Sequence, residues 1–256
     1  MALRNDDGLL LSGSLFLRNR RIADAPFVEV GNVTSLQFEP ESETKTRESR
    51  QKGTLGQILD SVVISKGVGI SWKFDTFNRE NMAFALSGDS VTVAGAVTPV
   101  PEAEYTVAKL GEIVALPHSD IDPATLVVKN KRGEQLADGL FELNPTLGFL
   151  TIHPEADNGG TGAVKAGEKI KVAYSTKGNS GFEVLAQTVT DFDFELRLNG
   201  YNHASSKDCV LEVPSVKVAA DGAIDWLSGE FANTGAKGKV VTVNGNKYSY
   251  KYRELG

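Results

Sequence analysis

The clearest pattern along this chain is an alternation of apolar and polar side chains. Residues 68–75 and 191–199 are its best examples, and such alternation predicts strands with one buried face. The spacing becomes helical only after Asn78, which can cap a short helix that ends by Gly88. The pattern therefore predicts a mainly β fold, a β-sandwich or partial barrel with one short flanking helix.

A long charged segment, residues 39–53, lies between predicted strands at 28–38 and 58–65. It has no apolar side chain except Pro40, so it cannot form a core of its own. In an extended backbone, the charges at odd positions share one side. We interpret the segment as a functional loop, which folds back as a ribbon or pairs with another copy; a solvated surface loop is the simpler alternative. Its charged residues are Glu39, Glu41, Glu43, Lys45, Arg47, Glu48, Arg50 and Lys52.

The middle of the chain has a different texture, with short strand patterns separated by glycine-rich and proline-rich turns. This texture predicts an inserted small β domain at 98–177, between the two parts of a first domain at 1–97 and 178–256. The strands expected inside the insert are 113–116, 126–129, 140–143, 149–153 and 169–174.

Several turns and irregularities are also predicted. Lys66–Gly67 is expected to be a turn, and Asn244–Gly245 is expected to join the last two strands as a hairpin. Gly13 is expected to mark a bulge, and Pro214 is expected to mark a bulge or a sheet edge. The basic stretch 18–21 is interpreted as a solvated turn, with a phosphate or acidic partner as the alternative.

The strand at 191–199 presents a polar face made of Asp191, Asp193, Glu195 and Arg197. Three acids on one sheet face repel each other unless cations or basic neighbours screen them. A solvated outer face is the simplest interpretation of this row.

Composition narrows the function classes. The chain has 256 residues and a formal net charge of −6, which argues against a nucleic-acid-binding surface. It carries one cysteine and no apolar stretch of about 18 residues, so we expect neither an intramolecular disulfide nor a transmembrane helix. The start of the chain does not resemble a signal peptide.

Candidate chemistry is sparse. His118, His153 and His203 are far apart, and no nucleophile elbow, phosphate loop or dinucleotide motif occurs. Asp191 and Asp193 could form a carboxylate pair or a Ca²⁺ site, but neighbouring strand positions meet the distance of a catalytic pair without any cleft. We therefore expect no catalytic, cofactor or metal site and no enzyme; a hydrolase is the weakest alternative.

The order of elements resembles the tail tube (major tail) protein of long flexible-tailed bacteriophages. The resemblance lies in Gly31–Leu36 followed by the charged segment, in the helix after Phe74–Asp75, and in the 191–199 strand followed by Ile224–Trp226 and a tyrosine-rich strand. It covers about residues 9–97 and 178–255.

The resemblance implies a structural virion protein, made in the host cytoplasm, whose rings, typically of six copies, stack into the hollow tail tube that passes DNA into the host. It implies partners: further copies of the chain, a tape measure protein, a tail terminator and a distal tail protein, with no membrane. It places the charged segment between rings and makes the acidic face a candidate lumen lining that repels DNA phosphates. The alternative is a β-sandwich adhesin or capsid-decoration module that binds through the insert.

Overall fold

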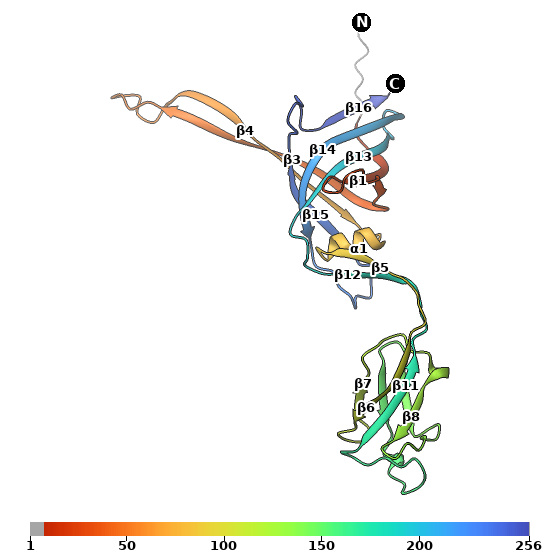
Figure 1. Ribbon diagram of the computed structural model, residues 1–256. Coiled ribbons are helices and arrows are strands. Elements are labelled where there is room, and N and C mark those ends of the chain that lie inside the picture. Colours follow the sequence, from red (N-terminus) through yellow and green to blue (C-terminus); the bar gives the residue numbers. More distant parts are fainter. Residues whose placement is uncertain (1–7, 256) are drawn as a thin grey trace. The chain divides into compact units, whose positions relative to one another are not determined.

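A computed structural model describes residues 8–255 and divides the chain into two compact units (Figure 1). Unit 1 comprises the chain up to Val91 and from Val184, and unit 2 comprises Thr92–Glu183. The boundaries predicted at 98 and 177 both lie inside unit 2. The observed boundaries lie closer to the ends of unit 1 than the predicted ones. The chain passes between the units through β5 (Asp89–Val93) and β12 (Gly181–Leu185), and the composition of the sequence does not reveal that these two strands pair with each other.

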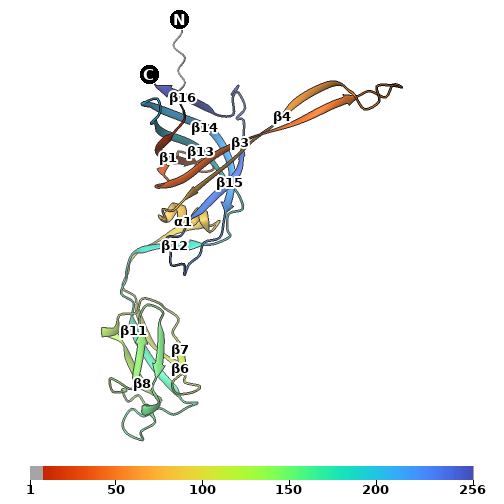
Figure 2. The ribbon, with the colours of Figure 1, turned by 180° about the vertical axis from the view of Figure 1, so that it is seen from behind.

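Unit 1 is built on one antiparallel sheet of eight strands, in the order β2-β1-β13-β14-β15-β4-β3. The remaining strand, β16, pairs with the first part of β14, and β15 pairs with its last part. Figures 1 and 2 show that this sheet is twisted and curved. The fold class is mainly β, as predicted. The strands are β1 (Leu11–Asn19), β2 (Val28–Glu29), β3 (Val33–Glu48), β4 (Ile58–Phe74), β13 (Phe192–Asn202), β14 (Lys207–Asp221), β15 (Thr234–Val240) and β16 (Lys251–Leu255).

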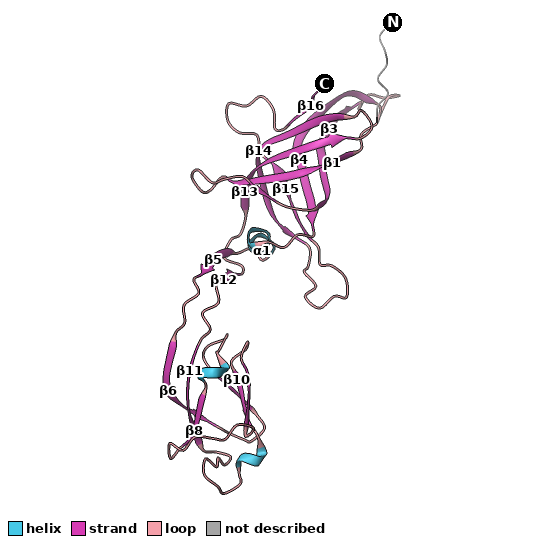
Figure 3. Ribbon diagram, turned by 90° about the vertical axis from the view of Figure 1, so that its right-hand side faces the viewer, coloured by secondary structure: helices cyan, strands magenta, loops and turns pink. Residues whose placement is uncertain are grey.

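One short helix, α1 (Arg79–Ala85), lies at one end of the curved sheet (Figure 3), and its Phe84 belongs to the buried core. The predicted cap is confirmed, because the Asn78 side chain accepts a hydrogen bond from the Asn81 backbone N–H at 2.8 Å. From the helix, Phe84 packs against aromatic rings of β4 and β13, with centroids 4.8 to 6.3 Å apart. The helix therefore completes an aromatic core rather than adding a separate layer.

Two strand predictions need correction near β3 and β4. The expected strand at 28–38 is two strands, because Gly31 has a positive φ of 89° that breaks the extended backbone. The expected turn at Lys66–Gly67 is absent, since β4 continues through it with a register shift beside Gly67.

The strand register decides the two predicted bulges and the predicted hairpin. Pro214 does lie in an irregular stretch, where the register of β13 and β14 shifts. Gly13 is regularly paired; it permits close approach, since a Cβ there would lie 2.3 Å from the Asn199 carbonyl oxygen. Asn244–Gly245 is a turn but not a hairpin, because β15 and β16 both pair with β14.

Unit 2 has its own small core between two three-stranded antiparallel sheets, β7-β10-β9 and β6-β11-β8. Ile121, Val128, Leu150 and Ile170 are among its fully buried side chains. The elements are β6 (Pro99–Thr106), β7 (Ile113–Ala115), β8 (Val127–Asn130), β9 (Phe141–Asn144), β10 (Phe149–Ile152), β11 (Lys169–Ser175) and the 3-10 turns η1 (Pro123–Thr125) and η2 (Pro154–Ala156).

Candidate assembly surface

The outer halves of β3 and β4 form a two-stranded arm, residues 42–65, that extends away from the rest of unit 1 (Figures 1 and 2). Most of the segment predicted as a loop is therefore strand: residues 39–48 pair with β4, and only Arg50 and Lys52 of the predicted charged set lie in the turn at the tip. The aliphatic stretch at 58–64 supplies the paired strand, so the charged segment does not fold back on itself.

The tip of the arm has a defined structure. The backbone N–H of Ser49 donates to the Gln57 carbonyl at 2.7 Å, and Gly56 N–H donates to the Ser49 carbonyl at 2.9 Å. The Ser49 side chain is buried and lies 2.7 Å from the Thr54 hydroxyl. These bonds close the arm as a hairpin with an ordered turn.

The strand register gives the arm two different faces. Cross-strand pairs on one face combine charged and aliphatic residues: Glu43 with Ile64, Lys45 with Val62, and Arg47 with Asp60. Pairs on the other face are uncharged: Ser42 with Ser65, Thr44 with Val63, and Thr46 with Ser61. The odd-numbered charges of β3 thus share one face, because side chains alternate along a strand.

The arm exposes aliphatic side chains that nothing in the described chain covers. Ile58, Leu59, Val62 and Val63 are each more than half exposed. Over residues 42–48 and 58–65, no other strand of residues 8–255 pairs with either outer edge of the ribbon. A two-stranded ribbon with open edges and exposed aliphatic side chains is a template for pairing with another chain.

Few charges of the arm region have partners within the described chain. Glu41 pairs with Lys239 of β15 at 2.8 Å, and Glu43 pairs with Lys66 at 2.5 Å. No ion pair within residues 8–255 involves the four bases Lys45, Arg47, Arg50 and Lys52. These bases remain available to another molecule.

The predicted acidic face is neutralised by arginines, which corrects the expectation of an open negative surface. Asp193 and Glu195 lie on β13, and Asp191 precedes it. All three carboxylates pair with the basic stretch that ends β1, which was interpreted as a solvated turn. The pairs are Arg18–Glu195, Arg20–Asp193 at 3.0 Å, Arg21–Asp191 at 2.5 Å and Arg197–Glu195 at 2.8 Å.

This ion-pair ladder has a physical cause that the separate strand patterns did not reveal. Antiparallel pairing of β1 with β13 places Arg18 opposite Glu195. The Arg21 guanidinium hydrogen-bonds to Asp191 and lowers the pKa of that carboxyl group. Arg18 and Arg197 each lie 4.9 Å from the centre of the Phe27 ring, so the guanidinium groups are also held by an aromatic face.

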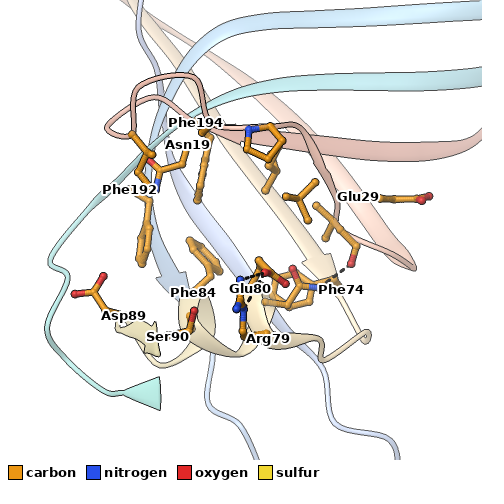
Figure 4. Close-up of a pocket in the computed structure, with 18 of the residues that line it drawn as sticks. Asn19, Glu29, Phe74, Arg79, Glu80, Phe84, Asp89, Ser90, Phe192 and Phe194 are labelled. Atoms are coloured by element: carbon orange, nitrogen blue, oxygen red, sulfur yellow. Dashed lines mark hydrogen bonds and ion pairs between the residues drawn. The ribbon is translucent and has the colours of Figure 1, made fainter. Parts of the chain in front are cut away.

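Unit 1 also contains an apolar pocket of about 440 Å³ between β1, α1 and β13 (Figure 4). Phe74, Phe84, Phe192 and Phe194 line it, and we call it the phenylalanine pocket. Arg79, Asp89 and other polar residues also contribute to its lining. Trp72 lines it too, and the indole N–H of that residue has no acceptor among the described residues.

The histidines occupy unconnected sites. His118 Nδ1 lies 2.8 Å from the Tyr174 hydroxyl, and His203 Nε2 lies 2.8 Å from the Ser12 hydroxyl. Over residues 8–255, no group of three or more histidine, cysteine or acidic side chains is placed to hold a metal ion. Cys209 is buried. Within the same range, no helix has the length and apolar character needed to cross a membrane.

Comparison with known proteins gives a family but no activity. A family model described as "Protein of unknown function UCP028589" matches residues 9–250. No curated protein matches the sequence. The arm, the ion-pair ladder and the exposed apolar side chains are therefore the features of this chain that bear on its function.

Proposed function

This chain belongs to the UCP028589 family of proteins of unknown function. Because the family description names no activity, we propose the function of this chain from its own geometry and from its resemblance to phage tail tube proteins. The protein is a structural subunit of a virion, without enzymatic activity. Copies assemble into rings, and the rings stack into a hollow tail tube through which DNA passes. A tape measure protein, a tail terminator and a distal tail protein are its further partners.

The observation that carries this proposal is the β3/β4 arm. Isolated two-stranded ribbons are marginally stable in water, and exposed strand edges promote association with other chains. In this arm, the two outer strand edges are open, and four aliphatic side chains are mostly exposed. A neighbouring copy that pairs with the arm and covers these side chains removes both costs.

The charges of the arm support a contact between repeated copies. Each exposed ion pair contributes only about 0 to 1 kcal/mol. Many such pairs around a ring set the register between rings without making the contact irreversible. The four unpaired bases near the tip are suited to carboxylates of the next ring.

The β13 face remains our candidate for the lumen lining, in a changed form. Its three carboxylates are paired with four arginines, so it presents nearly balanced charge rather than a negative wall. A face without a large excess of either sign holds no phosphate tightly, because phosphate binding depends on uncompensated positive charge. DNA therefore slides along this face without specific binding.

One observation favours the second candidate, an adhesin or capsid-decoration module. Unit 2 has its own hydrophobic core of twelve buried residues, so it can present a surface without depending on the unit 1 core. In that case the arm is dispensable and the protein acts as a monomer or a small oligomer.

Shortening the arm separates these candidates. Ser42 and Ser65 are cross-strand partners, so residues 43–64 can be replaced by an Asn-Gly turn between them. For a tube subunit, negative-stain electron microscopy should show hollow tubes or stacked rings of the full chain at rising concentration, and folded but unstacked particles of the shortened chain. Tubes formed without the arm would refute its proposed role. Uniform small particles of both chains would favour the binding module.

A further inference from the structure

A second exposed apolar element lies in the connection between β14 and β15, residues 221–233, which we call the β14/β15 loop. Trp226 is 65% exposed, Leu227 is 96% exposed and Phe231 is 97% exposed. The backbone beside them is braced, because Leu227 N–H donates to the Asp225 carboxylate at 3.1 Å. Large apolar side chains exposed together in one short loop are typical of a surface that another molecule covers.

The β14/β15 loop also carries uncompensated negative charge. It contains Asp221, Asp225 and Glu230 and no lysine or arginine. All three acids are exposed, and no ion pair within residues 8–255 involves any of them. A partner for this loop therefore needs both an apolar surface and positive charge.

The outer part of the arm has both properties. Residues 45–60 contain four bases and two acids, and no ion pair within the described chain involves those bases. Beside them, Leu55, Ile58 and Leu59 are 76%, 64% and 52% exposed. Opposite charges on the arm and the loop favour their encounter and fix their register, and contact between them removes apolar side chains of both from water.

The strand register places these two surfaces at opposite ends of the sheet. β4 runs from Ile58 in the arm to Phe74, and Phe74 pairs with Thr234, which begins β15 directly after the loop. At the usual rise of a strand, β4 spans about 50 Å between these ends. The outer part of the arm is thus too far from the loop of its own chain to contact it, so the partner is another copy.

We propose that the arm of one copy docks on the β14/β15 loop of a copy in the next ring, with the bases of the arm against the three carboxylates. This inference rests on the proposed function and deepens it, because it names the surface that receives the arm. Arm and loop are different surfaces of one chain, so the contact is heterologous. Since they lie at opposite ends of the sheet, each copy gives its arm to one ring and receives an arm from the other, and the contact repeats along the tube.

Charge reversal tests the contact while both surfaces stay in place. The loop variant reverses the acids of the loop: Asp221→Lys, Asp225→Lys and Glu230→Lys. The arm variant reverses the bases of the arm: Lys45→Glu, Arg47→Glu, Arg50→Glu and Lys52→Glu. A combined variant carries both sets. All seven positions are exposed, so the fold should be retained, which circular dichroism checks.

A matched control reverses three exposed acids of unit 2 and so changes the net charge by the same amount as the loop variant. It carries Asp138→Lys, Glu142→Lys and Glu155→Lys. Any general effect of added positive charge on assembly appears in this control as well as in the loop variant.

The readout is the critical concentration for assembly, measured by sedimentation. Each exposed ion pair changes an association constant by about two- to fivefold, so the loop variant and the arm variant should each need about tenfold more protein or more. The combined variant restores opposite charges and should assemble at a concentration close to that of the unmodified chain and the control.

Three results would overturn the proposal. One is a loop variant that assembles as well as the control, as expected if arms pair only with one another. Another is a combined variant that assembles no better than the arm variant. The third is an unmodified chain that stays monomeric up to the limit of its solubility.

Fluorescence locates the contact at the loop. The difference between the unmodified chain and Trp226→Phe reports Trp226, because the buried Trp72 contributes to both. This emission should shift to the blue on assembly, and should not shift when residues 43–64 are replaced by the Asn-Gly turn. Unshifted emission in the assembled unmodified protein would show that the loop stays in water, which contradicts the proposed contact.

The outcomes separate this contact from the tube proposal. Tubes that the loop variant forms as readily as the control refute the contact and leave the tube function standing. Solid filaments that need opposite charges on arm and loop, and that enclose no channel, support the contact between copies and refute the tube.

Discussion

Replacing two exposed valines of the arm by aspartate should weaken assembly strongly while leaving the subunit folded. Val62 and Val63 lie on opposite faces of β4, paired with Lys45 and Thr44. Complete burial of a valine contributes about 1.5 to 2 kcal/mol, so covering the exposed 56% of Val62 and 66% of Val63 contributes about 2 kcal/mol per arm. That free energy corresponds to about a 30-fold change in the assembly constant. Burying the two new carboxylates makes the free energy of assembly still less favourable.

The assay is the critical concentration for assembly, measured as the protein that sediments in an ultracentrifuge over a concentration series. We expect the Val62→Asp/Val63→Asp protein to need at least about 30 times more protein than the unmodified chain. Its melting temperature at a dilution where neither protein assembles should change little, because exposed substitutions usually shift stability by about 0.5 kcal/mol or less. Val62→Ile/Val63→Ile keeps the apolar surface and should assemble normally. A critical concentration within twofold of the unmodified chain would show that the arm valines are not buried in the assembly.

Two further predictions concern the cores of the units. Phe84→Ala should destabilise unit 1 by about 3 to 5 kcal/mol in urea unfolding, because it empties a site that contacts four aromatic rings; an unchanged midpoint would refute the packing role of α1. In unit 2, hydrogen bonds from Lys129 and Lys169 lower the pKa values of Glu102 and Glu104. The stability these pairs add is therefore present above about pH 4.5 and is lost as the pH falls through the lowered values. Hydrogen exchange of β11 amides, divided by the intrinsic exchange rate at each pH, should accelerate over that window, and Glu102→Gln/Glu104→Gln should flatten the dependence.

Much of the fold could be predicted because local patterns determined it. The alternation at 68–75 became the buried half of β4, and Asn78 capped α1 as its side-chain chemistry requires. Five strands of unit 2, β7 to β11, were found within a few residues, since each is short and bounded by turns, whereas β6 was not predicted. These features depend on sequence neighbours alone.

The rest depended on long-range pairing, which a local pattern does not contain. The segment 39–48 has no apolar side chain and reads as a loop, yet it is held as a strand by hydrogen bonds to residues 58–69. The three acids read as a free negative face, yet three of the arginines that pair with them, Arg18, Arg20 and Arg21, lie at least 170 residues earlier in the chain. The basic stretch 18–21 and the three acids were both visible in the sequence, but only antiparallel pairing of β1 with β13 brings them together.

The pairing of β5 with β12 has a consequence for engineering. The segments just beyond these strands also lie together, since Thr176 N–H donates to the Thr98 carbonyl at 3.0 Å and a Cβ on Gly95 would lie 2.2 Å from the Gly178 carbonyl oxygen. Because the chain leaves and re-enters unit 1 at neighbouring points, a different domain inserted there loses little loop-closure entropy. Unit 2 can therefore be replaced, at the point where the chain leaves and re-enters unit 1, by a foreign domain whose own ends are close together.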